Sequence, residues 1–481
     1  MNVILVLVDA LRADHLGCYG YGRKTSPFID RMAKQGAIFR NAVAAASFTM
    51  PSHKAILTSV YDYGGNLEKL NPGIETLAEL LQKNGVETAA FISNAVTARQ
   101  SGLDKGFSYF DEGLGKMETG RGEKGQTAAE AAASALKWIE GKKGKSFFCF
   151  LQVVDTHGPY IPPKEFVEMF KDKQLEEQNK QKLAFSSNDL GYKSIPQYQQ
   201  VKGENKLGQY VARYDAAIRF VDSELERLWK KLQELGIEKE TVLIVTSDHG
   251  ESMGEHGWLF CHGINLYEES IRVPLVFSKA YGKAHSIKEQ AGHLDLAPTV
   301  LEMFGFQKGR RMQGESLMPL LKGQSLKREE LFIEMHSDVQ SKMVDTVVSA
   351  VRAGKWKYIE TRNLKGEGQI GKSAVRIMKG TRKFGLALVK STASKSVQLL
   401  PKMLMAKTGS VSRELYDLEK DKGEKKNLAS KNRQLVDLFG KKLQGWRERQ
   451  KRIQQSLPGI EKKIDATDEM KERLKKLGYF T

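Results

Sequence analysis

Asn2-Val-Ile-Leu-Val-Leu-Val8 is an unbroken apolar run that ends in a carboxylate, Asp9. A second run, Thr241-Val-Leu-Ile-Val-Thr246, leads in the same way into Ser247-Asp248-His249-Gly250. Short runs that are apolar at every position are typical of strands buried on both faces of a parallel sheet. In such sheets the chemistry lies beyond the carboxyl ends of the strands, so the residues after each run are the candidates for a functional site.

Outward from these runs, short apolar segments alternate with amphipathic, helix-like segments up to about residue 305, which predicts an α/β fold with a mostly parallel sheet between helices. The further predicted strands are Val86–Ile92, Ser146–Val154 and Val273–Phe277. The predicted helices are Ser26–Gln35, Ser52–Ser59, Ile74–Lys83, Thr127–Glu140, Leu207–Leu235 and Leu294–Phe304.

The pattern changes after about residue 310, which predicts a catalytic domain over 1–310 and a smaller α+β subdomain over 311–481. Its expected strands are Leu331–Met335, Val347–Thr361 and Glu414–Leu418, and its expected surface helices are Lys431–Gln455 and Asp465–Leu477. A polar stretch over Lys171–Gln200 predicts a surface excursion near the site.

The composition fits a water-soluble globular protein, because 40% of the 481 residues are hydrophobic and 28% are charged. No apolar stretch reaches the roughly 20 residues that cross a bilayer. The start of the chain lacks the pattern of a signal peptide, and the three cysteines are far apart, so we expect a reducing, cytoplasmic location.

Three strand ends offer metal ligands. Asp9 follows the first strand, Asp248 and His249 follow another, and Asp155-Thr156-His157 follows Ser146–Val154. Two carboxylates and an imidazole at one edge of a sheet are a plausible site for a divalent cation. Taken singly, each has a simpler explanation, because an aspartate after a strand is more often a helix N-cap.

Thr49 stands just before Pro51 and a predicted amphipathic helix. The start of a helix presents free N–H groups and the positive end of the dipole, which suits a phosphate or sulfate group. A threonine hydroxyl becomes nucleophilic only when a metal or base takes up its proton. On its own, Thr49 would be explained as an N-cap.

Together these segments resemble the sulfatase family of the alkaline phosphatase superfamily. The opening run Val8-Asp9-Ala-Leu-Arg12-Ala-Asp14-His-Leu-Gly17 is similar to the first family motif, Thr49-Met-Pro51-Ser52-His53 to the nucleophile motif, and Ser247-Asp248-His249-Gly250-Glu251 to the second metal motif. Further matches, in family order, are Leu266–Leu275, Asp295–Thr299, Gln313–Leu317, Val351–Tyr358 and Glu414–Leu418.

The resemblance implies roles for particular residues. It implies that one divalent ion, Mn²⁺, Mg²⁺, Ca²⁺ or Zn²⁺, is bound by Asp9, Thr49, Asp248 and His249. It further implies an anion pocket lined by His157, His262, His53 and Arg12, with His157 or His262 as the acid for the leaving oxygen. Asn94, which follows the strand Val86–Ile92, is a candidate contact to the ester, and Asp155 raises the question of a second metal.

Four departures from the family pattern bear on the chemistry. Sulfatases oxidise a cysteine or serine to formylglycine, but the methyl group on the β-carbon of Thr49 prevents that aldehyde from forming. His53 replaces the usual arginine of the nucleophile motif, and Ala10 replaces a second aspartate. Ser93-Asn94 replaces an expected Lys-x-x-His segment.

These departures favour phosphate-ester chemistry, either hydrolysis of a phosphodiester or phosphoryl transfer, with Thr49 as the nucleophile. They resemble the threonine-nucleophile branch that includes lipoteichoic acid synthases and phosphoethanolamine transferases. The alternative is a sulfuric ester hydrolase that acts on sulfated glycans or lipids. A non-catalytic binding protein is less favoured, because Thr49, Asp9, Asp248 and His249 are all present.

The formal net charge is +18, and a basic segment over about 362–410 carries much of it. Within it, Ala374–Lys390 mixes apolar and basic residues at near-helical spacing, which predicts peripheral contact with anionic lipid on the inner membrane face through 362–407. The substrate would then be an anionic ester such as a lipid headgroup or a lipid-linked glycan. A lid, a dimer contact or a solvated basic face would produce the same pattern, and nucleic acid is disfavoured because no recognised motif accompanies the charge.

Overall fold

The computed structural model describes ten stretches of the chain, and all structural statements below concern them. They are residues 1–61, 69–113, 117–118, 124–171, 182–186, 191–282, 285–328, 330–336, 346–363 and 409–458. The basic segment and the predicted helix over 465–477 lie outside these stretches, apart from residues 362–363 and 409–410, as does part of the predicted excursion over 171–200.

The main sheet has eight strands in the order β14-β2-β13-β10-β1-β7-β3-β4. They are β1 (Asn2–Val8), β2 (Ala37–Val43), β3 (Glu87–Phe91), β4 (Tyr109–Asp111), β7 (Phe147–Val153), β10 (Thr241–Thr246), β13 (Leu275–Phe277) and β14 (His285–Gly292). The run from β10 to β4 is parallel, whereas β13 is antiparallel to both of its neighbours. The predicted mostly parallel sheet is confirmed.

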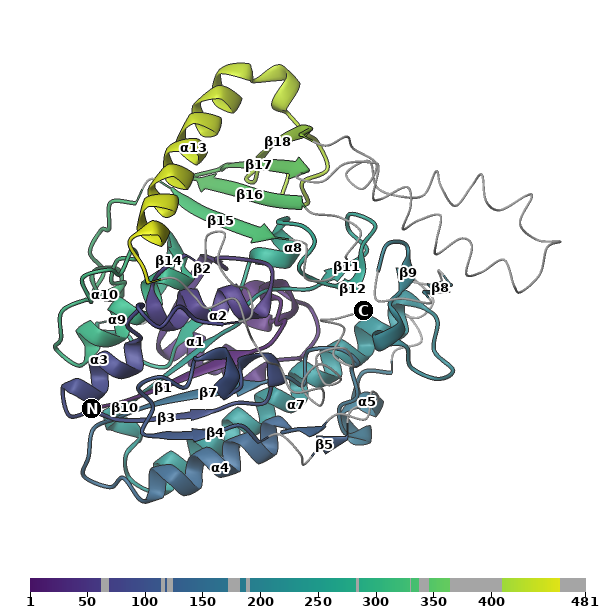
Figure 1. Cartoon of the computed structure of the whole chain (residues 1–481). Helices are drawn as coiled ribbons and strands as arrows, with labels where there is room; N and C mark the ends of the chain where they lie inside the picture. The colour runs from purple at the N-terminus through teal and green to yellow at the C-terminus, as the bar shows by residue number, and fades with distance from the viewer. Residues whose placement is uncertain are drawn as a thin grey trace.

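Helices cover both faces of this sheet (Figure 1). Alternate residues of β1 serve the two layers: Val3 and Leu5 pack in the cluster with α2, α3 and α9, and Ile4 and Val6 in the cluster with α1, α4 and α7. The helices are α1 (Pro27–Gln35), α2 (Thr49–Thr58), α3 (Leu77–Lys83), α4 (Ala128–Glu140), α7 (Leu207–Glu234) and α9 (Leu296–Met303). Full burial on both sides explains why the strand is apolar at every position.

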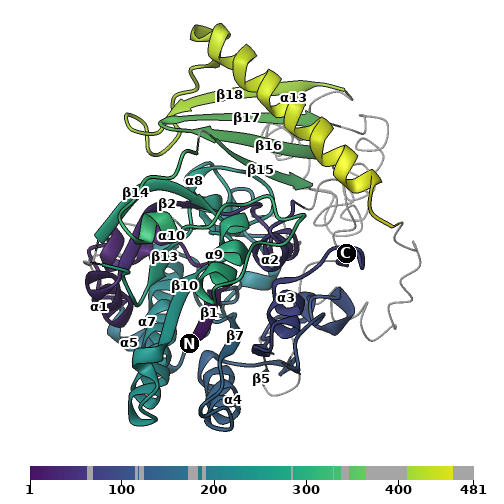
Figure 2. The same ribbon diagram turned by 90° about the vertical axis from the view of Figure 1, so that its left-hand side faces the viewer.

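The smaller sheet stacks beyond the α2 side of the main one, with α13 lying across it (Figure 2). It is antiparallel in the order β15 (Leu331–His336), β16 (Thr346–Ala353), β17 (Trp356–Asn363) and β18 (Val411–Asp417). Helix α13 (Arg433–Gln455) buries Phe439, Leu443 and Trp446 against it.

Short elements complete the described part of the chain. They are α5 (Lys164–Met169), α8 (Glu268–Ile271), α10 (Met318–Leu321), β5 (Met117–Glu118), β6 (Lys124–Gly125), β8 (Ala184–Phe185), β9 (Ser194–Ile195), β11 (Ser252–Met253) and β12 (Leu259–Cys261). No helix within the described stretches is long and apolar enough to cross a membrane. The predicted domain boundary near residue 310 and the predicted location stay predictions.

Several expectations about elements need correction. Strands β2, β4 and β14 were not predicted; β2 and β14 extend the sheet beyond β13, and β4 forms its other edge. The segment expected as a strand over Val347–Thr361 is the hairpin of β16 and β17. Helix α2 begins at Thr49 instead of Ser52, and it is not amphipathic, because all ten of its residues are buried. It lies between the main sheet and the elements around α9. No side of the helix faces solvent, so its sequence need not alternate between an apolar and a polar face.

Candidate active site

Four neighbouring parallel strands bring the predicted site residues to one edge of the main sheet. Asp9 follows β1 directly, Asp248 and His249 follow β10, His157 follows β7, and Asn94 follows β3. The sheet order β10-β1-β7-β3 places these strand ends side by side. The rule that functional residues gather beyond the carboxyl ends of the strands therefore holds here.

Each of the two carboxylates is anchored by one oxygen only. Asn94 Nδ2 donates to Asp9 Oδ2 at 2.9 Å, and the backbone N–H of Ala10 donates to Asp248 Oδ1 at 3.1 Å. Ala10 has φ of 57°, a left-handed conformation that costs an alanine about 1 kcal/mol or more. Asp9 Oδ1 and Asp248 Oδ2 are buried and have no hydrogen-bond partner among the described residues.

His249 directs its free nitrogen at these two oxygens. Its Nδ1–H donates to the carbonyl of Gly250 at 2.8 Å, which leaves the lone pair on Nε2. Nε2 lies 3.8 Å from Asp9 Oδ1 and 3.6 Å from Asp248 Oδ2. Gly250 is required for space and not for a left-handed turn, because a Cβ there would lie 2.0 Å from the carbonyl oxygen of Glu269.

This donor set fits a divalent cation. One ligand atom each from Asp9, Asp248 and His249 lies within 4.8 Å of the others, and all three residues are buried. Burial and the neighbouring Asp248 raise the pKa of Asp9 well above its usual value. Among the described residues the two carboxylates therefore lack a nearby positive charge, which a bound cation would supply. Burial lowers the pKa of His249, which favours the neutral imidazole that ligates metals.

Thr49 joins this cluster from the first turn of α2. Its Oγ1 lies 3.2 Å from His249 Nε2. The N-cap of α2 is Phe48, so Thr49 is not an N-cap, and the simpler explanation for this residue is wrong. One turn later, His53 donates from Nδ1 to the carbonyl of Thr49 at 2.8 Å.

The remaining nitrogen of His53, Nε2, is buried without a partner among the described residues. Burial lowers the pKa of His53, so the ring is neutral. The ring stands beside the site, with Nδ1 3.9 Å from Asp248 Oδ2.

The other two predicted histidines form a chain of ring contacts that leads away from His249. The ring of His262 lies 4.2 Å from that of His249, and the ring of His157 lies 5.1 Å from that of His262. His157 is half-buried and the other two are buried, so His157 is the most accessible of the three.

Three of the predicted residues make hydrogen bonds within the chain, and their expected roles toward the ester or a second metal stay predictions. Asn94 donates to Asp9 and so orients a ligand. Arg12 makes a two-point hydrogen-bonded pair with Asp14 and also binds Glu255, so its guanidinium is committed to carboxylates. Asp155 accepts the N–H of Ala128 in the first turn of α4, the helix that Thr127 caps.

Sequence reasoning left Glu251 without a role. Its side chain is fully buried, accepts from Tyr160 Oη at 3.0 Å, and lies 3.1 Å from His262 Nδ1. Glu251 belongs to the motif that contains Asp248 and His249, but nothing local in the sequence predicts a pairing with a residue eleven positions away.

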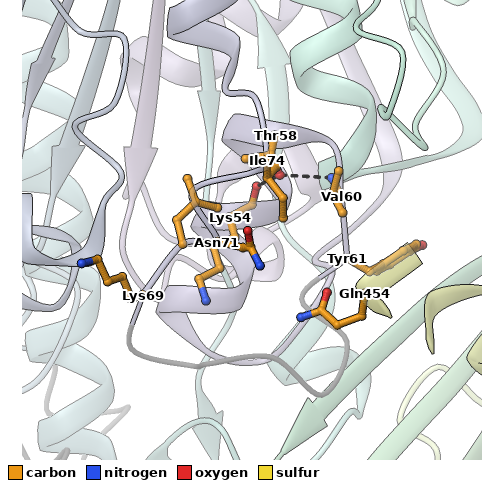
Figure 3. Close-up of a pocket in the computed structure, with 9 residues that line it drawn as sticks. Lys54, Thr58, Val60, Tyr61, Lys69, Asn71, Ile74 and Gln454 are labelled. Atoms are coloured by element: carbon orange, nitrogen blue, oxygen red, sulfur yellow. Dashed lines mark hydrogen bonds between the residues drawn. The ribbon is translucent and has the colours of Figure 1, made fainter. Parts of the chain in front are cut away.

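A separate pocket lies farther along α2 (Figure 3). Its lining residues are Lys54, Thr58, Val60, Tyr61, Lys69, Leu70, Asn71, Ile74 and Gln454. None of the cluster residues lines it, so it is not part of the candidate active site.

Two buried carboxylates, an imidazole and a hydroxyl at the start of a helix form a donor set that suits a divalent cation. The family described as "Sulfatase" matches residues 1–306, and the family described as "N-sulphoglucosamine sulphohydrolase, C-terminal" matches residues 254–367. The chain belongs to the sulfatase family of the alkaline phosphatase superfamily and is a hydrolase of that family.

Several of its relatives are named sulfatases. The chain is 24% identical over 398 residues to N-acetylglucosamine-6-O-sulfatase of Bacteroides thetaiotaomicron, covering 67% of this chain and 71% of that protein. It is 22% identical to Delta 4,5-hexuronate-2-O-sulfatase of the same organism, covering 89% and 84%. A structure of a protein in complex with its substrate D-glucosamine-2-N,6-O-disulfate superimposes with a TM-score of 0.68 at 19% identity, covering 94% and 98%.

These findings correct the main functional expectation. Phosphate-ester chemistry with Thr49 as the nucleophile is contradicted, because the relatives are named for sulfate esters of saccharides. The alternative, a sulfuric ester hydrolase, fits better. The departures that favoured phosphate concern single side chains, whereas the surrounding motifs carry the family signal.

Proposed function

We propose that this chain is a metal-dependent sulfuric ester hydrolase whose substrate is a sulfated saccharide. The main support is that two buried oxygens, Asp9 Oδ1 and Asp248 Oδ2, have no hydrogen-bond partner in the described part of the chain. They lie beside His249 Nε2 and Thr49 Oγ1 at the start of α2. The names of the relatives support the sulfated saccharide. The relatives give no support to a lipid headgroup as substrate.

Asp9, Asp248, His249 and Thr49 would hold the divalent ion. When bound, the ion supplies positive charge that neutralises an ester oxygen and acidifies an oxygen ligand. The first turn of α2 adds N–H groups and the positive end of its dipole, so the chain itself favours an anion at this place.

Thr49 serves to bind and orient in this proposal, and water is the attacking group. A sulfate ester formed on Thr49 would be an alkyl sulfate like the substrate, and it would need the same S–O cleavage again. Direct attack of water on sulfur avoids that second, equally slow step. Thr49 then fixes the sulfuryl group between α2 and the facing histidines, His262 and His157.

The test is a paired assay of purified protein on glucosamine 6-sulfate, a 2-sulfated hexuronate and p-nitrophenyl sulfate, with Mn²⁺, Mg²⁺, Ca²⁺ or Zn²⁺ added in turn. We expect metal-dependent release of inorganic sulfate. Thr49→Ser should keep more activity than Thr49→Ala, because the hydroxyl is retained. Bis-p-nitrophenyl phosphate serves as the control substrate.

Two outcomes would contradict the proposal. Turnover of the phosphodiester with none of the sulfate esters would contradict the substrate class. A +80 Da adduct on the peptide that contains Thr49, trapped during turnover of a sulfate ester, would contradict direct attack by water.

A further inference from the structure

His293 is a buried histidine that the proposed reaction does not use. We propose that His293 is a positioning residue that fixes two segments of the site relative to each other, the end of β10 and the approach to α2. This inference rests on the proposed function and deepens it, because those segments carry Asp248 and Thr49. In this role His293 acts through backbone groups of both segments.

The edge strand β14 delivers His293 to the carboxyl edge of the main sheet. Strand β13 is antiparallel to both β10 and β2, and β14 is parallel to β2, so β14 runs in the same direction as β10. The last pair between β14 and β2 is Gly292 with Val43, and His293 follows it directly. His293 therefore lies at the edge at which β10 ends.

Both nitrogens of the His293 ring bond to backbone groups. The N–H of Ala45 donates to Nδ1 at 3.2 Å, and Nε2 lies 2.9 Å from the carbonyl oxygen of Ser247. A backbone N–H can only donate and a carbonyl can only accept, so the ring carries its proton on Nε2. The two segments that the ring joins therefore set its tautomer and its orientation.

On the β10 side, this bond reaches the turn that carries the metal ligands. Ser247 precedes Asp248 directly, and its Oγ donates to the carbonyl of His249 at 2.6 Å. The same Oγ accepts the N–H of Leu11, two residues after Asp9, at 2.8 Å. The position of Ser247 therefore bears on all three buried ligands.

On the α2 side, the bond reaches the start of the helix. Ala45 lies four residues before Thr49. Leu294, the residue after His293, packs with Ala45 and with Ala55 of α2. His293 and its neighbour therefore help to set where Thr49 and the free N–H groups of the first helical turn stand.

The turn His293–Asp295 is itself held by the carboxylate of Asp295. This carboxylate accepts the N–H of Gly292 at 2.7 Å and the N–H of Glu315 at 3.0 Å. It also forms an ion pair with Arg328. The ring of His293 therefore stands on a fixed base, as a residue that holds two other segments in place requires.

Two conservative substitutions separate the two hydrogen bonds of the ring. His293→Asn keeps an acceptor at the place of Nδ1 and loses the donor to Ser247, whereas His293→Gln puts an amide N–H near the place of Nε2 and loses the acceptor for Ala45. Titration calorimetry with Mn²⁺, Mg²⁺, Ca²⁺ and Zn²⁺ measures the metal Kd of each protein. Assays on glucosamine 6-sulfate and a 2-sulfated hexuronate at saturating metal measure KM and kcat.

The two variants should change different quantities. We expect the metal Kd of His293→Asn to rise about 10-fold, because the ligand turn loses an orienting partner, and its KM at saturating metal to stay near wild type. His293→Gln should keep the metal Kd within about 3-fold of wild type. Its KM should rise about 10-fold, because the helix start that faces the sulfate group is no longer fixed.

Thr299→Val is the matched control. Thr299 is buried on α9, one turn beyond His293–Asp295, and its Oγ1 donates to the carbonyl of Asp295 and accepts the N–H of Leu317 at 2.8 Å. The substitution removes buried hydrogen bonds in the same region without touching either segment of the site. It should lower the melting temperature and leave the metal Kd and KM near wild type.

Equal changes of the metal Kd and KM in the two His293 variants, or changes no larger than those of Thr299→Val, would overturn the positioning role. If one variant fails to fold, the other still tests its own segment, because each is expected to change a different quantity. A wild type that binds metal but cleaves no sulfate ester would instead overturn the proposed function, and the metal Kd of the two variants would still decide the role of His293. The two failures are therefore distinguishable.

Discussion

The carboxyl edge of the main sheet and the contact between α13 and the smaller sheet both bury charged side chains, but they treat them differently. At the sheet edge, Asp9 Oδ1 and Asp248 Oδ2 have no partner within the described chain. Under α13, Arg447 donates to Glu360 Oε1 at 2.7 Å and to Ser349 Oγ at 2.8 Å, and Glu334 lies 3.7 Å away.

The difference indicates a binding site at the sheet edge and a purely structural contact between α13 and the smaller sheet. A buried charge without a partner costs stability, and the chain retains it where a ligand can supply the partner. A charge paired inside the chain needs nothing further. Neutralising a carboxylate at the sheet edge should therefore abolish function without loss of stability. Breaking the Arg447 pairs under α13 should lower stability and leave the site intact.

Asp9→Asn should give the largest effect. We expect activity to fall at least about 10³-fold, because a metal ligand and the chemistry that the metal supplies are lost. Since burial and Asp248 raise the pKa of Asp9, its charge is unfavourable without metal. The variant in EDTA should therefore melt at the same temperature as the wild type or higher, measured by scanning calorimetry.

Added metal sharpens this prediction. The wild type should gain thermal stability as the metal concentration rises above Kd, and Asp9→Asn should gain little. A variant that is less stable than the wild type in EDTA would mean that Asp9 is a structural residue.

Arg447→Met should give the next largest effect, this time on stability. It removes the buried guanidinium from Glu334 and from Glu360, which keeps Arg362 and Arg413 at its more exposed side, so we expect a loss of about 1.5–3 kcal/mol of unfolding free energy in urea titrations. Arg449→Met, at an exposed position on the same helix, is the matched control and should cost less than about 0.5 kcal/mol.

Equal losses for the two variants would show that the buried pair is not what holds α13. Adding Glu334→Gln to Arg447→Met should recover part of the loss, because the buried carboxylate that has lost its guanidinium partner is then neutral.

Asn94→Ala should weaken metal binding about 10- to 100-fold without removing a ligand. The reason is that Asn94 Nδ2 orients Asp9 through its anchored oxygen. Isothermal titration calorimetry with the metal measures the effect, and Asn84→Ala, which changes an exposed amide at the end of α3, is the control. An unchanged metal affinity in Asn94→Ala would contradict the role of Asn94 in orienting Asp9. It would favour the original expectation that Asn94 contacts the ester.

The same contrast explains which parts of the fold could be predicted from the sequence. Strands β1, β7 and β10 are buried on both faces, so each is mostly apolar and stands out locally. Strand β2 contains Arg40 and Asn41, and the edge strand β14 is mostly polar. Their places in the sheet come from pairing with distant segments, which leaves no local pattern.

The residues of the candidate site also differ in how far the local sequence predicts them. Asp9, Asp248 and His249 were predictable because a strand end places them whatever the rest of the chain does. The second partner of Arg12, Glu255, and the hydrogen bond from Tyr160 to Glu251 come from other segments of the chain. A residue type within a motif predicts the capacity for an interaction, whereas only the fold decides which partner is used.

Lowering the pH should give the smallest effect, and the pair of wild type and Arg447→Met isolates its action on the contact between α13 and the smaller sheet. Burial would raise the pKa of Glu360, but the hydrogen bond and charge of Arg447 outweigh it and hold the pKa below its usual value. A carboxylate whose pKa is lowered by folding contributes stability above the unfolded pKa of about 4, and this contribution is lost as the pH falls through the folded pKa. The stability gap between the wild type and Arg447→Met should therefore narrow between about pH 5 and pH 3, as urea titrations at each pH would show. A gap that stays constant over that range would mean that packing of the Arg447 stem, and not its charge, stabilises this contact.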